Sequence, residues 1–237
     1  MTPTIERITV SARFNGPPTS ANGGYACGLV AAAIGASASV RLLQPPPLEA
    51  AMIRRRDEDG TVRLLHGEAT VAEGRAAEPP TLEPPQRPDW AEAMRAALNY
   101  PGRDPEAHPF PDCFVCGPLR AADGLRIFPG PAGEGGLLAA PWQPEPDLAR
   151  DEIVDPIFVW CALDCPSGFA CIPPGTRTVL ATMTAAIHAP VRCDRRYVVT
   201  GWPIAGEGRK HRGGSAIHDA DGELVAVADT LWITLRA

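Results

Sequence analysis

Asp164 is the carboxylate that the sequence singles out for chemistry. It lies in the segment CALDCPSG, residues 161–168, which is otherwise apolar or small. A carboxylate buried in such surroundings has a perturbed pKa, and it can hold and deprotonate a water molecule. The alternative role is structural, because an aspartate before Cys-Pro-Ser-Gly can also cap a helix end or a turn.

Asn22, Gly23 and Gly24 precede a small, apolar run at residues 25–36 that is predicted to form a buried helix. Free N–H groups at a helix N-terminus can stabilise a developing negative charge, and the Asn22 side chain can add one more donor. The plain alternative is that Asn22 caps the helix while the glycines let another backbone approach closely.

His108, Cys113 and Cys116 form an H-x4-C-x2-C pattern, which is half of a zinc-site signature. The sequence does not identify a fourth ligand, although three cysteines elsewhere in the chain could supply it: Cys165, Cys171 and Cys193. A tight turn with packed thiols, or a redox-sensitive pair, would give the same pattern. We therefore assign no metal ligands and expect no cofactor, and the question of a structural metal stays open.

Covalent catalysis is the less favoured chemistry. The chain lacks a G-x-S-x-G sequence, and Cys165 and Ser167 are the nucleophile candidates on a predicted sharp turn. Either would need a neighbouring histidine as its base. Three histidines lie on predicted strands or at their ends, where each is more simply explained as a surface residue: His188, His211 and His218.

The composition is that of an ordinary globular protein, because 45% of the 237 residues are hydrophobic and 21% are charged. The net charge of −6 gives no basic field that would attract nucleic acid or an acidic membrane. No stretch approaches the roughly 20 apolar residues that span a bilayer, and the N-terminus lacks the features of a signal peptide. We therefore expect a cytoplasmic protein whose seven cysteines are reduced.

The first 76 residues show strand and helix patterning in turn. A strand is predicted at residues 4–14 and a buried helix at residues 25–36. Three further segments have the composition of strands: residues 37–45, 49–56 and 61–73. The last two are joined by Asp-Glu-Asp-Gly, which predicts a hairpin.

The same order returns after a proline-rich stretch with a short helix at residues 89–100. Strands are predicted at residues 124–130 and 136–144, and an apolar helix at residues 151–165 with Asp151 and Glu152 favourable at its start. Four strands follow, with an Asp-Ala-Asp-Gly hairpin between the last two: residues 177–190, 195–204, 209–219 and 222–235.

This repeated order predicts an α+β fold of the double hotdog type, in which each of two antiparallel sheets wraps around one central helix. The expected domains are an N-terminal hotdog at residues 1–76, a linker at residues 77–120 and a C-terminal hotdog at residues 121–237. The alternative is an unrelated α+β protein whose halves look alike by chance.

Three segments of the second half resemble the C-terminal hotdog of acyl-CoA thioesterase II and the wider thioesterase-like superfamily. They are ALDCPSGFA at residues 162–170, ATMTAAIHAP at residues 181–190, and the run from GWPIAGEGRK to DTLWITLR at residues 201–236. The resemblance covers residues 150–236, and the first half matches more loosely through NGGYACGLVAAAI.

The resemblance places the family's catalytic aspartate on Asp164 and its water-binding hydroxyl residue on Thr184. The third member of the family's set is usually a glutamine on the last strand, and Thr230 stands at that position. A threonine is too short to reproduce the reach of a glutamine amide, so the set departs from the family pattern here.

The resemblance implies a cofactor-independent hydrolase of acyl-CoA thioesters, with the acyl chain held between the two hotdog units. Fused hotdog dimers often lose one of their two equivalent sites, and a single site formed by Asp164 facing the Asn22–Gly24 loop, which would supply the oxyanion donors, is compatible with this. Arg209 and Lys210 would then be candidates to meet the phosphates of coenzyme A. Two alternatives stay open: a non-catalytic acyl-CoA or fatty-acyl binding protein, which the missing glutamine favours, and a hotdog hydratase or dehydratase. The last ranks lower because neither predicted central helix carries a histidine. Assembly into a homo-oligomer also stays open.

Overall fold

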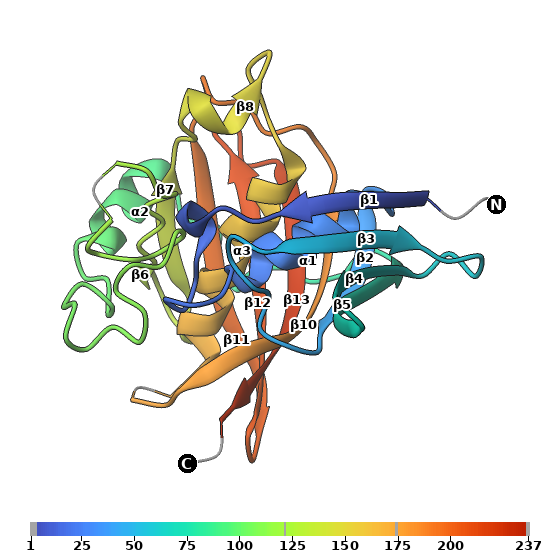
Figure 1. The fold of residues 1–237 in the computed structure, drawn as a ribbon. Coiled ribbons are helices and arrows are strands. Elements are labelled where there is room, and N and C mark those ends of the chain that lie inside the picture. The colour runs from blue at the N-terminus through green and yellow to red at the C-terminus, as the bar shows by residue number, and fades with distance from the viewer. Residues whose placement is uncertain (1–3, 121, 174, 236–237) are drawn as a thin grey trace.

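The computed structural model describes residues 4–120, 122–173 and 175–235. Within these residues eleven strands form one antiparallel sheet (Figure 1). In chain order they are β1 (Thr4–Thr9), β2 (Ser37–Leu42), β3 (Ala51–Arg56), β4 (Val62–His66), β5 (Ala69–Ala76), β6 (Gly130–Pro131), β7 (Leu138–Trp142), β10 (Thr178–Ile187), β11 (Tyr197–Glu207), β12 (Lys210–Asp219) and β13 (Leu224–Thr234). A separate two-stranded ribbon is formed by β8 (Ala149–Arg150) and β9 (Ile153–Val154).

The strand order of the large sheet is β1-β3-β4-β5-β2-β10-β13-β12-β11-β7-β6. The first half of the chain contributes the strands on one side of the β2–β10 pair, and the second half contributes the strands on the other side. Apart from the short β6, each side repeats the order of the other when read outward from β2 and β10. One continuous sheet is therefore built from two similar halves.

Two apolar helices, α1 (Gly23–Ala31) and α3 (Pro156–Cys171), pack against each other on the same side of the sheet (Figure 1). Both are apolar around most of their circumference, which is typical of helices buried in a core. Asn22 caps α1 by accepting a hydrogen bond from the Tyr25 N–H, and Asp155 caps α3 in the same way. The helix pair and the sheet around it enclose the main hydrophobic core.

The segment between the two halves crosses from one face of the sheet to the other. Its helix α2 (Trp90–Ala97) has the capping box of Asp89 and Glu92 that its sequence favours. Ala93 and Ala96 of this helix pack on the sheet face opposite α3. The chain then returns to the helix side, where the ring of Tyr100 contacts Phe169 of α3. None of the helices in the described ranges is long and apolar enough to cross a membrane.

Local expectations are confirmed at both hairpins, at the Asn22 cap and at α2. The predicted start of the second apolar helix is wrong. Asp151 and Glu152 have positive φ angles in the turn between β8 and β9, and the helix begins at Pro156.

Two other expectations need correction in this half. Cys165 and Ser167 do not lie on a sharp turn, because α3 continues through Pro166 to Cys171. The Ser167 hydroxyl donates a hydrogen bond to the Asp164 carbonyl, 2.7 Å away. The strand predicted at residues 124–130 is reduced to the two residues of β6.

Candidate functional site

Asp164 lies at the contact between the two buried helices. Its Oδ2 accepts a hydrogen bond from the Asn22 Nδ2 at 2.7 Å and another from the Gly24 N–H at 2.9 Å. Its Oδ1 is buried and has no hydrogen-bond partner among the described residues. The side chain is 2% exposed. The carboxylate is therefore held through one oxygen and keeps the other free.

Glycines in α1 make this contact possible. A Cβ atom on Gly24 would lie 2.6 Å from the Trp160 carbonyl oxygen, and one on Gly28 would lie 2.9 Å from the Cα of Ile157. Both distances are too short for a real side chain, so α1 and α3 approach as closely as their backbones allow. The first turn of α1 can then point an N–H group directly at the Asp164 carboxylate.

The surroundings of Asp164 raise its pKa from 3.8 to about 7. Burial is the main cause, and the nearby Cys113 raises the pKa further, while the hydrogen bonds from Gly24 and Asn22 oppose the shift. The carboxyl group therefore exchanges its proton near neutral pH, which suits a general base.

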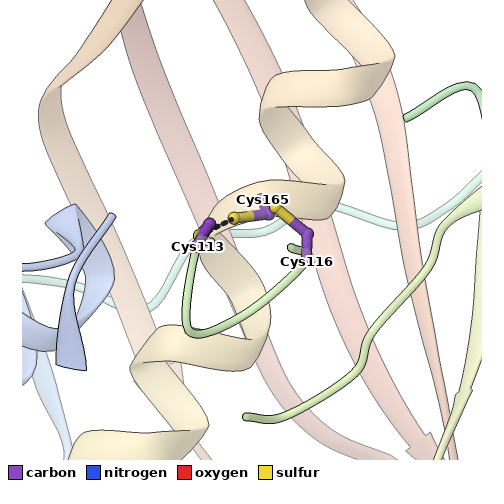
Figure 2. Close-up of side chains that lie close together, drawn as sticks. All are labelled: Cys113, Cys116 and Cys165. Atoms are coloured by element: carbon purple, nitrogen blue, oxygen red, sulfur yellow. Dashed lines mark hydrogen bonds between the residues drawn. The ribbon is translucent and has the colours of Figure 1, made fainter. Parts of the chain in front are cut away.

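Residues 110–120, which we call the cover segment, lie over this part of α3 (Figure 2). The Phe114 N–H donates to the Asn15 carbonyl at 2.8 Å, just ahead of α1. The Phe114 ring packs against Phe14 and Phe158. The cover segment thus joins the entry of α1 to α3 beside the buried Asp164 side chain.

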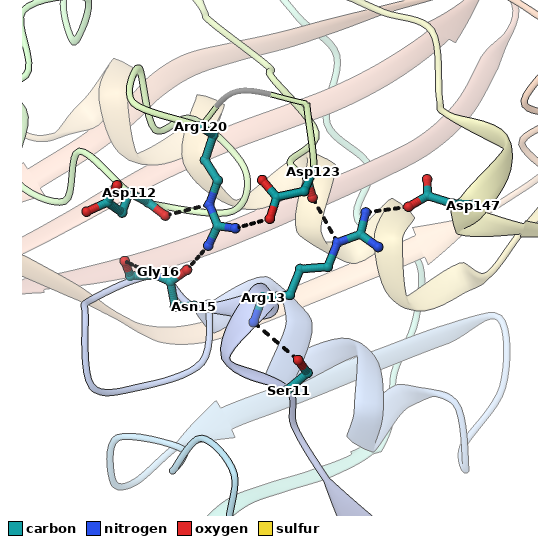
Figure 3. A network of polar contacts seen from close by, with 8 residues as sticks. All are labelled: Ser11, Arg13, Asn15, Gly16, Asp112, Arg120, Asp123 and Asp147. Carbon is teal, nitrogen blue, oxygen red and sulfur yellow. Dashed lines mark hydrogen bonds and ion pairs between the residues drawn. The ribbon is translucent and has the colours of Figure 1, made fainter.

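A polar network fixes the cover segment in place (Figure 3). The Arg120 guanidinium donates to the Asp112 carbonyl at 2.8 Å, pairs with the Asp123 carboxylate at 2.7 Å and bonds to the Asn15 side chain. Arg13 donates to the Asp123 carbonyl at 2.9 Å. Charge-assisted bonds to several acceptors hold a chain segment more firmly than single surface ion pairs do.

Thr230 faces the helices, but its hydroxyl is already engaged. It donates to the Gly213 carbonyl at 3.0 Å and accepts from the Trp232 indole N–H at 3.1 Å. The same indole lies 3.2 Å from the Ser167 hydroxyl, which bonds to the Asp164 carbonyl. Thr230 therefore reaches the backbone of Asp164 through two side chains and does not contact its carboxylate.

Thr184 lies on the other face of the sheet from the helices. Its neighbour Met183 pairs with Thr230 on β13, and both point toward the helices, so Thr184 points away from them. Its hydroxyl donates to the Ser39 hydroxyl at 2.8 Å. The structure does not bring Thr184 to Asp164, and the water-binding role expected for it has no geometric support.

The Asn22–Gly24 loop faces Asp164 as expected, but its donors are used differently from the expectation. The Asn22 amide and the Gly24 N–H point at Asp164 and not toward an open site. Arg209 lies in the turn between β11 and β12, and Lys210 is the first residue of β12. Arg209 donates to the Thr234 carbonyl at 3.1 Å.

Three cysteines come together beside Asp164. The Sγ atoms of Cys113, Cys116 and Cys165 all lie within 4.8 Å of one another, and all three residues are buried (Figure 2). Of the three cysteines that the sequence offered as partners for the C-x2-C pair, the structure brings in Cys165. The choice depends on where α3 crosses the cover segment, for which the sequence carries no local signal.

The ring nitrogens of His108 bond to groups other than the three cysteine sulfur atoms. Its Nδ1 accepts from the Phe110 N–H at 2.9 Å, so its proton resides on Nε2, which lies 2.8 Å from the Tyr100 hydroxyl. Tyr100 in turn donates to the Cys116 carbonyl at 3.0 Å. Burial lowers the pKa of His108, in keeping with a neutral ring.

Comparison with known proteins identifies the fold. No protein-family model matches the chain, and no curated protein matches its sequence. Solved structures match it over nearly its whole length. A tesB protein from Mycobacterium avium subs. paratuberculosis has a TM-score of 0.62 and 11% identity, covering 99% of this chain and 93% of that one.

Two further structures agree. Acyl-CoA thioesterase II TesB2 from Mycobacterium marinum has a TM-score of 0.61 and 14% identity, covering 98% of this chain and 93% of that one. A conserved protein of unknown function with a hot dog fold from Alicyclobacillus acidocaldarius has a TM-score of 0.61 and 9% identity, covering 98% and 94%. The chain therefore has a hotdog-type fold, as its resemblance to the thioesterase-like superfamily implies.

Proposed function

We propose that this protein is a double hotdog that hydrolyses acyl-CoA thioesters with a water molecule activated by Asp164. The observation that carries the proposal is the state of this carboxylate. It is buried, one oxygen is fixed by two donors from the other helix, and the second oxygen has no partner in the described chain. The fold shared with thioesterase II structures supports the same reaction class.

Helix contacts support the reading of two equivalent halves. Gly24 of α1 lies against Cys161 of α3, and Gly28 of α1 lies against Ile157 of α3. Exchanging Gly24 with Ile157 and Gly28 with Cys161 turns each contact into the other. A two-fold relation of this kind would also exchange the two sides of the β2–β10 pair. Both observations support the proposal of two hotdog units joined into one chain.

The same relation makes the two halves chemically unequal. It makes Asn22 equivalent to Asp155, because each caps its helix. Counting the same number of residues into each helix then makes Ala31 equivalent to Asp164. The position equivalent to Asp164 thus has no carboxylate. The proposed protein has one reaction centre, at the contact of Asp164 with the first turn of α1.

The reaction at this centre needs a base, an attacking water and a site for the carbonyl oxygen. The free Oδ1 of Asp164 takes a proton from the water molecule while the water oxygen forms a bond to the thioester carbonyl carbon. The C–S bond then breaks, and the departing thiolate of coenzyme A recovers the proton. The N–H of Gly23, which no group in the described residues accepts, is the remaining donor at the start of α1 for the developing oxyanion.

A groove of about 570 Å³ beside the helix pair is the proposed place for the acyl chain. Its volume lies in the range of small-molecule sites. It is lined mainly by small and apolar side chains from the end of α1, the start of α3 and the chain after β10, including Ala31, Ala32, Trp160 and Ile187. Trp160 precedes Asp164 by about one helical turn, roughly 6 Å along the axis.

The cover segment favours a second function, the binding of an acyl group without turnover. Asp164 is 2% exposed and the cover segment packs beside it, so entry of water and substrate to the carboxylate would require the packing around it to open. Thr230 has no amide that could bind the attacking water, and its hydroxyl already donates to the Gly213 carbonyl. A folded protein that binds acyl-CoA and never releases free coenzyme A would have this second function.

The test is release of free coenzyme A from short, long and aromatic acyl-CoAs by the wild type and by Asp164→Asn. The asparagine can accept the same two hydrogen bonds but cannot act as a base, so turnover should fall by about a hundredfold or more. Asp89→Asn is the matched control, because it changes an aspartate that caps α2, away from α1, α3 and the groove, and keeps a good helix cap. Full turnover by Asp164→Asn would place the chemistry elsewhere, and no turnover by folded wild type would favour the binding function.

A further inference from the structure

The three cysteines beside Asp164 have the arrangement of metal ligands. Cys113 and Cys116 come from the cover segment and Cys165 from α3, so the cluster joins two parts of the chain that are 49 or more residues apart (Figure 2). Their Sγ atoms all lie within 4.8 Å of one another. The side chains converge on one point between the loop and the helix.

We propose that these three cysteines bind one zinc ion that fastens the cover segment to α3. Zinc binds thiolates at about 2.3 Å in tetrahedral sites, which places neighbouring sulfur atoms about 3.8 Å apart. The Sγ atoms of Cys113 and Cys165 are 3.8 Å apart. The C-x2-C spacing is also that of a zinc knuckle, in which a short loop supplies two ligands.

The surroundings favour a metal over a disulfide. A disulfide would use two of the three sulfur atoms and leave the third as a buried thiol. The three residues are exposed by only 3%, 2% and 8%, and regulatory disulfides form at accessible cysteines. A zinc ion uses all three and needs no contact with an oxidant.

The second layer of contacts holds the loop in shape. The Tyr100 hydroxyl donates to the Cys116 carbonyl, and His108 positions Tyr100 through its Nε2. The Gly117 N–H donates to the Cys113 carbonyl at 2.9 Å and closes the turn. A Cβ atom on Gly117 would lie 2.5 Å from the Cys113 backbone nitrogen, so a glycine is required there. Outer contacts of this kind orient metal ligands.

Three protein sulfur atoms leave the fourth position of a tetrahedral zinc ion without a ligand from this cluster. His108 does not fill it here, because both of its ring nitrogens are engaged, one by Phe110 and one by Tyr100. The effect of the zinc is structural because its ligands come from two segments: it staples the cover segment to Cys165, the helix residue that follows Asp164. This inference does not depend on the proposed hydrolysis.

The test measures zinc in the full-length protein. Purified wild type should retain about one zinc ion per chain, by mass spectrometry, against a moderate chelator. Replacement of that zinc by Co2+ should give thiolate-to-metal charge-transfer absorption. Cys116→Ser and Cys165→Ser should bind at least about a hundredfold more weakly, and Cys171→Ser, on the same helix but outside the cluster, should bind as the wild type does.

The Co2+ titration of wild type keeps the test decisive if a variant fails to fold. Folded wild type that shows no charge-transfer absorption, or loses its zinc to the moderate chelator, would overturn the proposal. A disulfide among Cys113, Cys116 and Cys165, found by peptide mass spectrometry in protein purified without oxidant, would overturn it as well. A chelator that lowers the midpoint temperature of thermal unfolding in wild type but not in Cys116→Ser would support the zinc staple.

Discussion

Ionisation of Asp164 should destabilise the folded protein, and asparagine at this position should remove that dependence on pH. Burial raises the pKa of Asp164 to about 7, against the opposing hydrogen bonds from Gly24 and Asn22. Asparagine has nearly the same shape, and its Oδ1 can accept both of those bonds. Asp164→Asn therefore keeps the contact between α1 and α3 and carries no titratable proton.

The magnitude follows from proton linkage. The folded state holds the proton of Asp164 more tightly than the unfolded state does, so raising the pH favours unfolding. Each unit of pKa corresponds to about 1.4 kcal/mol, so the rise from 3.8 to about 7 amounts to about 4 kcal/mol in the free energy of unfolding. This stability is present below about pH 4 and is lost as the pH rises to 7. Between pH 5 and pH 8 the loss is about 2–3 kcal/mol.

The assay is urea unfolding of wild type and Asp164→Asn at several pH values from 5 to 8, followed by far-ultraviolet circular dichroism. Both proteins are treated with a chelator so that no cation lies beside Asp164. Their other titrating groups are the same, so the difference in unfolding free energy isolates Asp164. It should shift in favour of the variant by about 2–3 kcal/mol over this range. A difference that does not change with pH would refute the reasoning, because Asp164 would then titrate as an ordinary, hydrated aspartate.

Two further predictions concern packing and pH. Gly24→Ala should destabilise the protein by about 1–3 kcal/mol in urea unfolding, because its Cβ would lie 2.6 Å from the Trp160 carbonyl oxygen. Gly23→Ala, which meets flexible leucine side chains, should destabilise it less, and equal losses would contradict the close helix approach. Burial and then Arg87 lower the pKa of His218, so the unfolded state binds its proton more readily. The contribution of His218 to stability should therefore be lost as the pH falls below about 6.5, so His218→Leu should gain stability relative to wild type over that range; a difference between the two proteins that does not change with pH would count against a buried neutral ring.

Features that depend on neighbouring residues could be predicted from the sequence. The hairpins at residues 57–60 and 219–222 carry turn residues that fit few other conformations, and the Asn22 cap and the α2 helix have equally local signals. The order of one strand, one helix and several strands, which occurs in both halves, could be predicted for the same reason. These signals need no knowledge of what packs against them.

The limits of α3 were harder to predict because its ends are set by packing. Asp151 and Glu152 suit a helix start by charge, yet the β8–β9 ribbon takes them and gives them positive φ angles. Pro166 predicts a break after Asp164, yet the helix continues to Cys171. Burial of the whole apolar stretch against the sheet outweighs the hydrogen bond that the proline cannot donate.

The hypothesis of two fused hotdogs placed Asp164 opposite the Asn22–Gly24 loop, but it did not predict that Asn22 and Gly24 would donate to the carboxylate itself, because these groups lie 140 or more residues away along the chain. The face of the sheet on which Thr184 lies could not be predicted from the sequence either. The pairing of β10 with β13 shifts register between Leu180 and Thr182, and a shift of one residue changes which side chains face the helices. An alternating strand pattern carries no sign of such a bulge.

In the proposed double hotdog, the connection between the halves decides how the two equivalent positions differ. The chain passes α2 on the outer face of the sheet and returns to the helix side at α3, where the cover segment lies over Asp164. Ala31, the counterpart of Asp164, lines the groove proposed for the acyl chain. One connecting segment can cover only one of the two positions, and it covers the one that keeps the carboxylate. Access to Asp164 would therefore depend on the contacts that hold the cover segment. These are the hydrogen bonds of Arg120 and the cluster of three cysteines.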